Sequence, residues 1–217
     1  MSRHGTDPSY LATVQKRGFP VVLTVRPLEG DAFDFVGTNN FLGAQLSAEH
    51  LIKLGHKHIA FIGGKECSKG RSQRLGGYMS KLMEHGLSFN QSYVRTTSAS
   101  RVDGALVTKT LLDEHPEITA IICYQDIVAF GVMKEIKEKG LEVGRDIAVV
   151  GFDDVSESSV TSPTLTTVSV SSRDIGRAAG EVILARMNGD NGSFKSSIFS
   201  PKLVVRESCG ETPSDLV

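Results

Sequence analysis

The stretch VVGFDD, residues 149–154, joins two valines, a glycine and a phenylalanine to two adjacent aspartates. A short apolar run that ends at charged residues is typical of a buried strand. Carboxylates seldom lie in a protein core, so two of them directly after such a strand require an explanation. We therefore take Asp153 and Asp154 as the carboxyl end of a core strand and ask what surrounds them.

Short apolar runs alternate with amphipathic stretches along the rest of the chain. The apolar runs predict strands at 19–25, 58–64, around Val94, and at 118–124, 145–152, 165–170 and 199–208. The amphipathic stretches predict helices at 40–55, 72–85, 102–114, 127–140 and 172–188. This alternation predicts an α/β fold with parallel, doubly wound sheets that carry helices on both faces.

In such folds, ligands bind outside the carboxyl ends of the strands. The segments expected at those ends are polar, flexible or charged. They are Gly63-Gly64 with KECSKGRSQR (65–74), TTSAS (96–100), YQD (124–126) and FDD (152–154). The sequence therefore predicts a site for a small polar molecule at this edge.

Composition sets the class of protein. The 217 residues are 40% hydrophobic and 23% charged, as in soluble globular proteins, and the net charge of -1 gives no basic surface for nucleic acid. The three cysteines form no spaced pair, which fits a reducing compartment. Neither a secretory signal nor an apolar membrane span is evident. We therefore expect a cytoplasmic protein.

Catalytic and cofactor motifs are not found in the sequence. It has no GxSxG, GxxxxGK[ST], HExxH or GxGxxG pattern. His56 and His58 flank the start of a predicted strand and lack a nearby third ligand, so no metal site is indicated. We expect no cofactor and no enzymatic activity.

Five stretches, in this order and spacing, resemble the LacI/GalR family of bacterial transcriptional regulators. They are HLIKLGHKHIAFIGG, RLGGYMSKLMEHGL, HPEITAIICYQDIVAFGVMKEIKEKGLEVGRDIAVVGFDD, SPTLTTVSVSSRDIGRAAGEVILARM and PKLVVRES. The resemblance covers about Pro20 to Ser208. It implies a two-lobed, periplasmic-binding-protein-like domain that binds a small polar effector, expected to be a sugar or sugar derivative, between its lobes.

The resemblance also implies how the chain is organised. Residues 1–57 and 166–190 correspond to an N-terminal lobe, 58–165 and 198–208 to a C-terminal lobe, and 209–217 to a tail. The first strands of the N-terminal lobe and the helix-turn-helix headpiece have no counterpart here, so the first lobe is expected to be incomplete. Relatives act as homodimers, and operator DNA would be bound only through the missing headpiece.

Three residues match effector-contacting positions of the family. Asp153 stands at the aspartate of the GFDD motif, and a carboxylate can accept hydrogen bonds from adjacent sugar hydroxyls. Arg74 stands before LGGY, where a guanidinium can contact neighbouring oxygens. Gln125 replaces the family's asparagine and can both donate and accept.

Four further candidates mark departures from the family or neighbours of these contacts. Ala99 stands where many relatives have a stacking aromatic, and Ser68 and Gly70 stand where some have a basic or hydroxylated contact. Tyr124, next to Gln125, could supply a replacement ring. The departures leave the class of ligand open.

Nearby residues also have structural explanations. Asp126 is expected to be the N-cap of helix 127–139, and Asp154 to cap the turn after the strand. Arg71 could assist Arg74, while either arginine could simply be an exposed residue at a helix start.

Two other classes of function remain. A periplasmic sugar-binding protein of a transport system would have the same fold, although LGHKHIAFIGG is of the regulator type and no signal peptide is seen. A Rossmann-like enzyme is disfavoured because the nucleotide fingerprint and an acid–base pair are missing.

Overall fold

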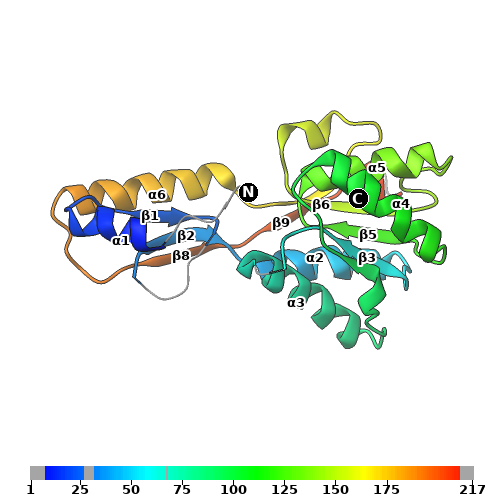
Figure 1. The fold of residues 1–217 in the computed structure, drawn as a ribbon, viewed down its shortest axis with the longest axis horizontal. Helices are drawn as coiled ribbons and strands as arrows, with labels where there is room; N and C mark the ends of the chain where they lie inside the picture. The colour runs from blue at the N-terminus through cyan, green and yellow to red at the C-terminus, as the bar shows by residue number, and fades with distance from the viewer. Residues whose placement is uncertain (1–7, 27–31, 67, 211–217) are drawn as a thin grey trace. The chain divides into compact units, whose positions relative to one another are not determined.

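In the computed structural model, residues 8–26, 32–66 and 68–210 are described, and the chain divides into two compact units (Figure 1). Unit 1 takes the residues up to Thr38 together with Ser171–Phe199. Unit 2 takes Asn39–Val170 together with the residues from Ser200 onwards. Each unit is therefore built from two stretches that lie far apart in the sequence.

Unit 1 is a small sheet against which a long helix packs. Its three described strands, β1 (Val22–Thr24), β2 (Asp34–Thr38) and β8 (Ser196–Phe199), are parallel and lie in the order β1-β2-β8. Helix α6 (Ser172–Met187) contacts both β1 and β2, and the shorter helix α1 (Pro8–Lys16) precedes the sheet (Figure 1).

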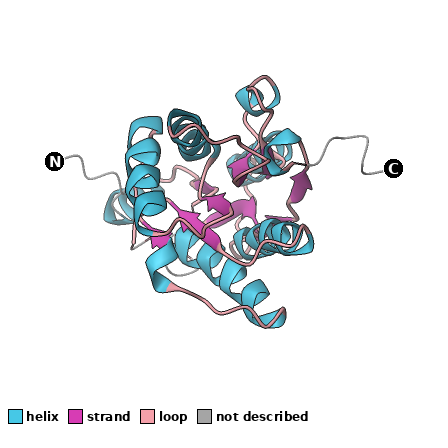
Figure 2. Cartoon of the chain, turned by 90° about the vertical axis from the view of Figure 1, so that its right-hand side faces the viewer, coloured by secondary structure: helices cyan, strands magenta, loops and turns pink. Residues whose placement is uncertain are grey.

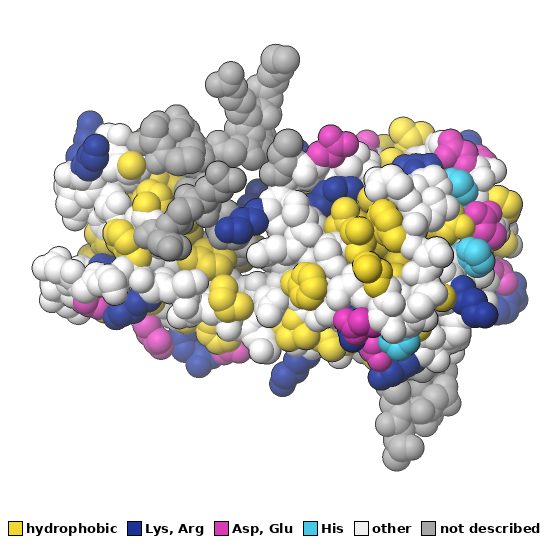
Figure 3. All heavy atoms as spheres, turned by 90° about the horizontal axis from the view of Figure 1, so that it is seen from below, with side chains coloured by type: hydrophobic (Ala, Val, Ile, Leu, Met, Phe, Trp, Pro, Cys, Tyr) yellow, Lys and Arg dark blue, Asp and Glu magenta, His cyan; other side chains and the backbone are white. Residues whose placement is uncertain are grey.

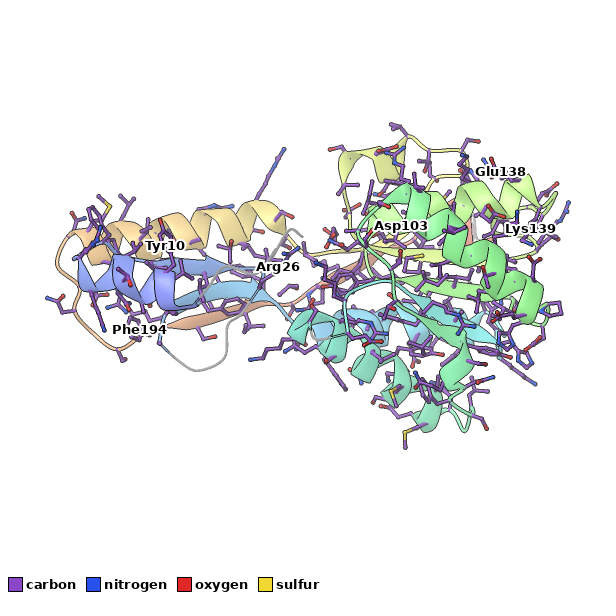
Figure 4. The ribbon with its side chains drawn as sticks, viewed as in Figure 1. Tyr10, Arg26, Asp103, Glu138, Lys139 and Phe194 are labelled. Carbon is purple, nitrogen blue, oxygen red and sulfur yellow. The ribbon has the colours of Figure 1, made fainter. Side chains whose placement is uncertain are left out.

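A buried ion pair ties α6 to this sheet. Arg186 donates from Nε to Asp34 Oδ2 at 2.8 Å and from Nη2 to Asp34 Oδ1 at 2.9 Å. Asp34 is 1% exposed, and its Oδ1 also accepts the backbone N–H of Lys195 at 2.8 Å. The same guanidinium donates to three backbone carbonyls of the turn between α6 and β8. Phe194, labelled in Figure 4, belongs to that turn, and its ring centroid is 5.6 Å from the guanidinium carbon.

Within the described residues, the sheet of unit 2 has six strands and lies between two layers of helices (Figure 2). In sheet order, the strands are β4 (Val94–Arg95), β3 (Ile59–Ile62), β5 (Ala120–Cys123), β6 (Ala148–Asp153), β7 (Thr166–Ser169) and β9 (Lys202–Val204). The first five run parallel, and β9 is antiparallel to β7. Every residue of β3 and β5 is buried, as expected of central strands covered on both faces.

The helices of unit 2 form one core on each face of its sheet. Phe61 packs with Leu51 and Tyr78 in one cluster, whereas its neighbour Ile62 packs with Val128 in the other. The alternation follows from the two-residue period of a strand. The helices are α2 (Asn40–Lys53) and α3 (Lys69–Glu84) on the first face, and α4 (Arg101–Glu114) and α5 (Asp126–Glu138) on the second.

The α/β fold with mostly parallel sheets is confirmed, with local differences. Helix α3 begins at Lys69 rather than at residue 72, because Ser68 is its N-cap and accepts the N–H of Arg71. The single strand expected at 199–208 is wrong. The chain leaves β8 of one sheet at Phe199 and enters β9 of the other at Lys202.

The division into units differs from the expected lobe boundaries. Helix α2 lies in unit 2 rather than in the first lobe, because Ala48 and Leu51 are buried in the core that α2 shares with α3. Strand β7 also lies in unit 2, since it pairs with β6. The chain passes between the units after Thr38, Val170 and Phe199.

Candidate functional site

Polar residues gather at the carboxyl edge of the unit 2 sheet. Strands β3, β5 and β6 are neighbours and end at Ile62, Cys123 and Asp153. Because parallel neighbours end at the same edge, the segments that follow them lie close together. Helix α3, which follows β3, contributes Arg74 to this edge.

Arg74 lies beneath this edge with its side chain 5% exposed. Its Nε donates to Asn40 Oδ1 at 2.8 Å, its Nη1 donates to the carbonyl of Tyr124, and its Nη2 is 3.8 Å from Asp153 Oδ1. The guanidinium carbon is 3.4 Å from the ring centroid of Phe152 and 4.5 Å from that of Tyr124. Burial lowers the pKa of Arg74, and the charge of Asp153 opposes this shift.

Asp153 is the more accessible partner, with 28% of its side chain exposed. Its Oδ2 accepts a hydrogen bond from Gln125 Nε2 at 3.4 Å. Its backbone φ of 114° lies in a region that residues with a side chain rarely adopt. The structure thus brings Arg74, Gln125 and Asp153 together, and their ligand-binding role remains a prediction.

Ser68, Gly70 and Tyr124 form the neighbouring part of the edge. Ser68 Oγ accepts the N–H of Arg71 at 3.4 Å. A Cβ atom at Gly70 would lie 3.1 Å from the Tyr124 hydroxyl and 3.8 Å from Ser68 Oγ. The Tyr124 ring therefore lies between the first turn of α3 and the guanidinium of Arg74.

Ala99 is exposed in the loop before α4. The loop is held by Asp103, labelled in Figure 4, whose Oδ2 accepts hydrogen bonds from Ser98 and Ser100. These bonds lower the pKa of Asp103. None of the hydrogen bonds or ring contacts of the described residues connects Ala99 to Arg74 or Asp153, and its role in binding remains a prediction.

Arg71 has a structural partner. Its side chain is buried and its Nε donates to the carbonyl of Gly63 at 3.1 Å. Arg71 therefore holds the loop after β3, and its assistance to Arg74 remains a prediction.

The N-cap prediction for Asp126 is wrong. Gln125 holds the N-cap position and makes no capping hydrogen bond with its side chain, while α5 begins at Asp126. The carboxylate of Asp126 is fully buried and crosses to a different part of the unit, where it binds Val155, Ser158 and Thr167.

Asp154 is structural, as predicted, but through a different partner. Its Oδ1 accepts from Arg206 Nη2 at 2.8 Å, and Arg206 Nη1 donates to the carbonyl of Leu165 at 2.6 Å. The carboxylate therefore joins the end of β6 to the segment after β9, rather than capping its own turn.

Sequence reasoning missed Asn40. It is 4% exposed, accepts from Arg74 and donates from Nδ2 to Gln73 Oε1 at 3.1 Å. Its neighbour Asn39 is the N-cap of α2 and accepts the N–H of Leu42 at 3.0 Å. The sequence does indicate a second role here: two asparagines stand at the start of the helix, and only one of them is needed to cap it.

This arrangement can hold polar groups. The carboxylate of Asp153 accepts a hydrogen bond from the amide of Gln125 and forms an ion pair with the buried guanidinium of Arg74, which the ring of Tyr124 flanks. Among the described residues, no cluster of three or more His, Cys, Asp or Glu side chains could hold a metal ion. The donors and acceptors suit a ligand rich in hydroxyl groups.

Residues 48–209 match the model of the family described as the periplasmic binding protein-like domain. The chain belongs to the periplasmic binding protein-like family. The match covers most of the chain, from helix α2 to the end of the described residues. It confirms the fold that the resemblance implied.

Curated relatives of this periplasmic binding protein-like chain are LacI-type regulators. The maltose regulon regulatory protein MalI of Escherichia coli (strain K12) is 27% identical, over 92% of this chain and 61% of its own length. The HTH-type transcriptional repressor PurR of Haemophilus influenzae (strain PittEE) is 32% identical, over 81% of this chain and 53% of its own length. The chain therefore spans between half and two thirds of the length of these relatives.

Solved structures give the same result. A transcriptional regulator CelR–cellobiose complex is 26% identical, with a TM-score of 0.87, over 93% of this chain and 62% of its own. A LacI family transcriptional regulator from Enterococcus faecium with bound ribose has a TM-score of 0.86 over 94% of this chain and 75% of its own, and at 23% identity it supports the fold alone. The resemblance to the effector-binding domain of LacI/GalR regulators is confirmed.

Proposed function

We propose that this chain is the part of a bacterial transcriptional regulator that binds a sugar or sugar derivative and changes the regulator's affinity for DNA. The observation that carries the proposal is the group Arg74, Gln125 and Asp153 at the carboxyl edge of the unit 2 sheet. The carboxylate of Asp153, partly exposed, would accept hydrogen bonds from two neighbouring hydroxyls, and Gln125 would donate to a ring or hydroxyl oxygen.

Arg74 would contact the ligand from the buried side of the site. Its Nε and one N–H of Nη1 already serve Asn40 and the carbonyl of Tyr124, so one N–H of Nη1 and both N–H groups of Nη2 are left for Asp153 or a ligand. Ser68, Gly70, Ala99 and Tyr124 would form the rim that determines which sugar fits.

A titration of the full chain by calorimetry with D-ribose, maltose and cellobiose tests the proposal, and saturable binding of at least one of them is expected. Absence of binding by all three and by their phosphorylated forms would contradict it.

Asp153→Asn tests the central contact. It replaces a charged acceptor by a neutral one, so we expect the bound sugar to lose about 1.5–3 kcal/mol of binding free energy, measured by the same titration. Asp113→Asn is the control, since Asp113 lies on α4 with its side chain 61% exposed and pairs with Lys139. Equal sugar affinity in the two variants would show that Asp153 does not contact the sugar.

We also propose that two copies of the chain associate through α4. Val102 and Leu106, 77% and 63% exposed, stand four residues apart and so share one face of that helix. Val160, 78% exposed, follows the 3₁₀ helix Ser156–Ser159, which an ion pair between Arg101 and Glu157 joins to the start of α4. An apolar stripe of this kind fits a second copy of the same surface.

The double change Val102→Asp and Leu106→Asp is expected to convert a dimer to a monomer in sedimentation equilibrium, because four like charges would face one another across the contact. Met83→Asp, on α3 with Met83 71% exposed, is the matched control and should leave the dimer intact. A wild-type monomer, or a dimer that survives the double change, would contradict this surface.

Operator DNA would be bound by a headpiece that precedes a domain of this kind, and we place the regulator in the cytoplasm, where DNA is accessible. Basic and acidic side chains are interspersed on the face shown in Figure 3, which lacks the basic stripe of a DNA-binding surface in the residues drawn there. No helix in the described part of the chain has the length and apolar character to span a membrane. The named relatives are regulators, so the transport alternative is not favoured.

A further inference from the structure

Asp126 lies next to Gln125 in the chain, but its carboxylate points to the loop after β6. It is fully buried, and its Oδ2 accepts the backbone N–H of Val155 and the hydroxyl of Ser158, both at 2.9 Å. Its Oδ1 accepts the hydroxyl of Thr167 on β7 at 2.6 Å. One buried side chain therefore joins the start of α5, the loop 153–158 and β7.

The loop that Asp126 holds begins with two residues in unfavourable backbone conformations. Asp153 has φ 114° and Asp154 has φ 54°, and such values cost residues with a Cβ atom free energy unless the surroundings fix them. Upstream, β6 is held by its pairing with β7. Downstream, the N–H of Val155 is held by Asp126, and Asp154 is held by Arg206. The pair is thus fixed on both sides.

The Asp126 carboxylate lies against β6 at Gly151. A Cβ atom at Gly151 would overlap Asp126 Oδ1 and lie 2.9 Å from Leu165 Cδ2. A glycine on β6 is therefore required for the carboxylate to pass beneath the strand.

Buried carboxylates are unfavourable unless their hydrogen bonds compensate. Burial raises the pKa of Asp126, and the hydrogen bonds from Thr167, Val155 and Ser158 lower it. The nearby charge of Asp154 raises it further. An asparagine could keep an oxygen toward Val155 and Ser158 and donate from its amide to Thr167 Oγ1, because a hydroxyl can accept.

We propose that Asp126 is a positioning residue of the binding site: by holding the N–H of Val155 and the hydroxyl of Ser158, it keeps the Asp153–Asp154 turn in the conformation that presents Asp153 to Gln125 and Arg74. Its effect on a sugar rests on the proposed function. Its effect on the turn does not.

The test compares three variants of the full chain: Asp126→Ala, Asp126→Asn and Thr167→Val. Thr167→Val is the control, since it removes the bond to β7 and leaves the two bonds to the loop. Two quantities are measured below the unfolding transition. They are the backbone NMR shifts and couplings of Asp153 and Asp154, and the affinity for D-ribose, maltose and cellobiose.

In Asp126→Ala we expect Asp153 and Asp154 to leave the positive-φ region and any sugar affinity to fall about tenfold or more. In Asp126→Asn both readouts should stay close to wild type, and in Thr167→Val they should stay close to wild type even where stability falls. If Asp126→Ala does not fold, Ser158→Ala, which removes one loop bond, is read in the same way and should shift both signals.

Unchanged signals of Asp153 and Asp154 in a folded Asp126→Ala would overturn the proposal, as would an equal change in Thr167→Val. A wild type that binds none of the three sugars would count against the proposed function. The NMR readout would still decide whether Asp126 positions the turn.

Discussion

Replacing Asp34 by alanine is expected to lower the free energy of unfolding of unit 1 by about 3–5 kcal/mol, the range for removing one partner of a buried ion pair. The loss follows from geometry. Asp34 is 1% exposed, and Arg186 spans both its oxygens at 2.8 and 2.9 Å. Without the carboxylate, the Arg186 side chain, which is 10% exposed, loses the partner of both its Nε and Nη2 and keeps only Asp190, whose Oδ1 lies 3.7 Å from Nη1, as an opposite charge. Native-state hydrogen exchange of the β1 and β2 amides measures the change in unit 1 separately.

The acid dependence provides a second measurement. The hydrogen bond from Arg186 lowers the pKa of Asp34, with burial opposing. Since the folded pKa lies below the ordinary value of 3.8, the contribution of Asp34 is fully present above that value and is lost as the pH falls through the folded pKa. The Asp34→Ala variant should therefore lose less stability on acidification than the wild type.

Asp174→Ala is the matched control for this pair. Asp174 and Arg177 form an ion pair on the same helix, but their side chains are 48% and 68% exposed. Exposed pairs contribute about 0–1 kcal/mol, so the control should stay near wild type. Equal losses in the two variants would mean that the Asp34–Arg186 pair adds no more than a surface pair.

Gly77→Ala is expected to destabilise unit 2 by about 3 kcal/mol, the upper part of the usual range for overpacking. Gly77 is buried on α3 where it crosses α2. A Cβ atom there would overlap the carbonyl oxygen of Phe41 and lie 3.1 Å from Ala44 Cβ. A backbone carbonyl cannot rotate away as a side chain can, so the two helices must separate. Chemical denaturation followed by tyrosine fluorescence and far-UV circular dichroism measures the change.

The adjacent residue supplies the control. A Cβ atom at Gly76 would meet only the Phe41 ring, at 3.5 Å, which is ordinary contact. Alanine is favoured over glycine inside a helix by up to about 1 kcal/mol, so Gly76→Ala should be neutral or stabilising. A stable Gly77→Ala would show that α2 and α3 can move apart at little cost.

The sequence is sufficient for the fold because its strands are buried on both faces. Runs such as residues 118–124 and 145–152 are continuous and apolar, and the polar residues that follow them predict the edge at which Asp153 and Gln125 meet. Strand β2 could not be predicted in this way, since DFVGT is short and includes a glycine and a buried aspartate. Its aspartate makes sense only with Arg186, which lies 152 residues away.

The parts of the site that sequence does not reveal are those in which a side chain reaches a distant segment. The N-cap expectation for Asp126 is reasonable locally, because an aspartate at a helix start is favoured there. The structure prefers a partner 29 residues away, and no spacing rule encodes that choice. Asn40 is similar, since its contact with Arg74 depends on how α2 and α3 cross. Local patterns identify the strand ends, whereas tertiary packing selects the contacts.

The pairing of β2 with β8 affects the order in which the protein can form during synthesis. Thr38 donates to the carbonyl of Phe199, 161 residues later, whereas β3, β4 and β5 pair within residues 59–123. On a ribosome, the amino-terminal residues of unit 1 emerge before unit 2, yet neither β8 nor Arg186 exists until the residues of unit 2 that lie between them have been made. The carboxylate of Asp34 therefore has no Arg186 to pair with at the stage when the central strands of unit 2 can already assemble. Strand β2 is therefore translated before the strands of unit 2 but gains its neighbour β8 only after β3 to β7.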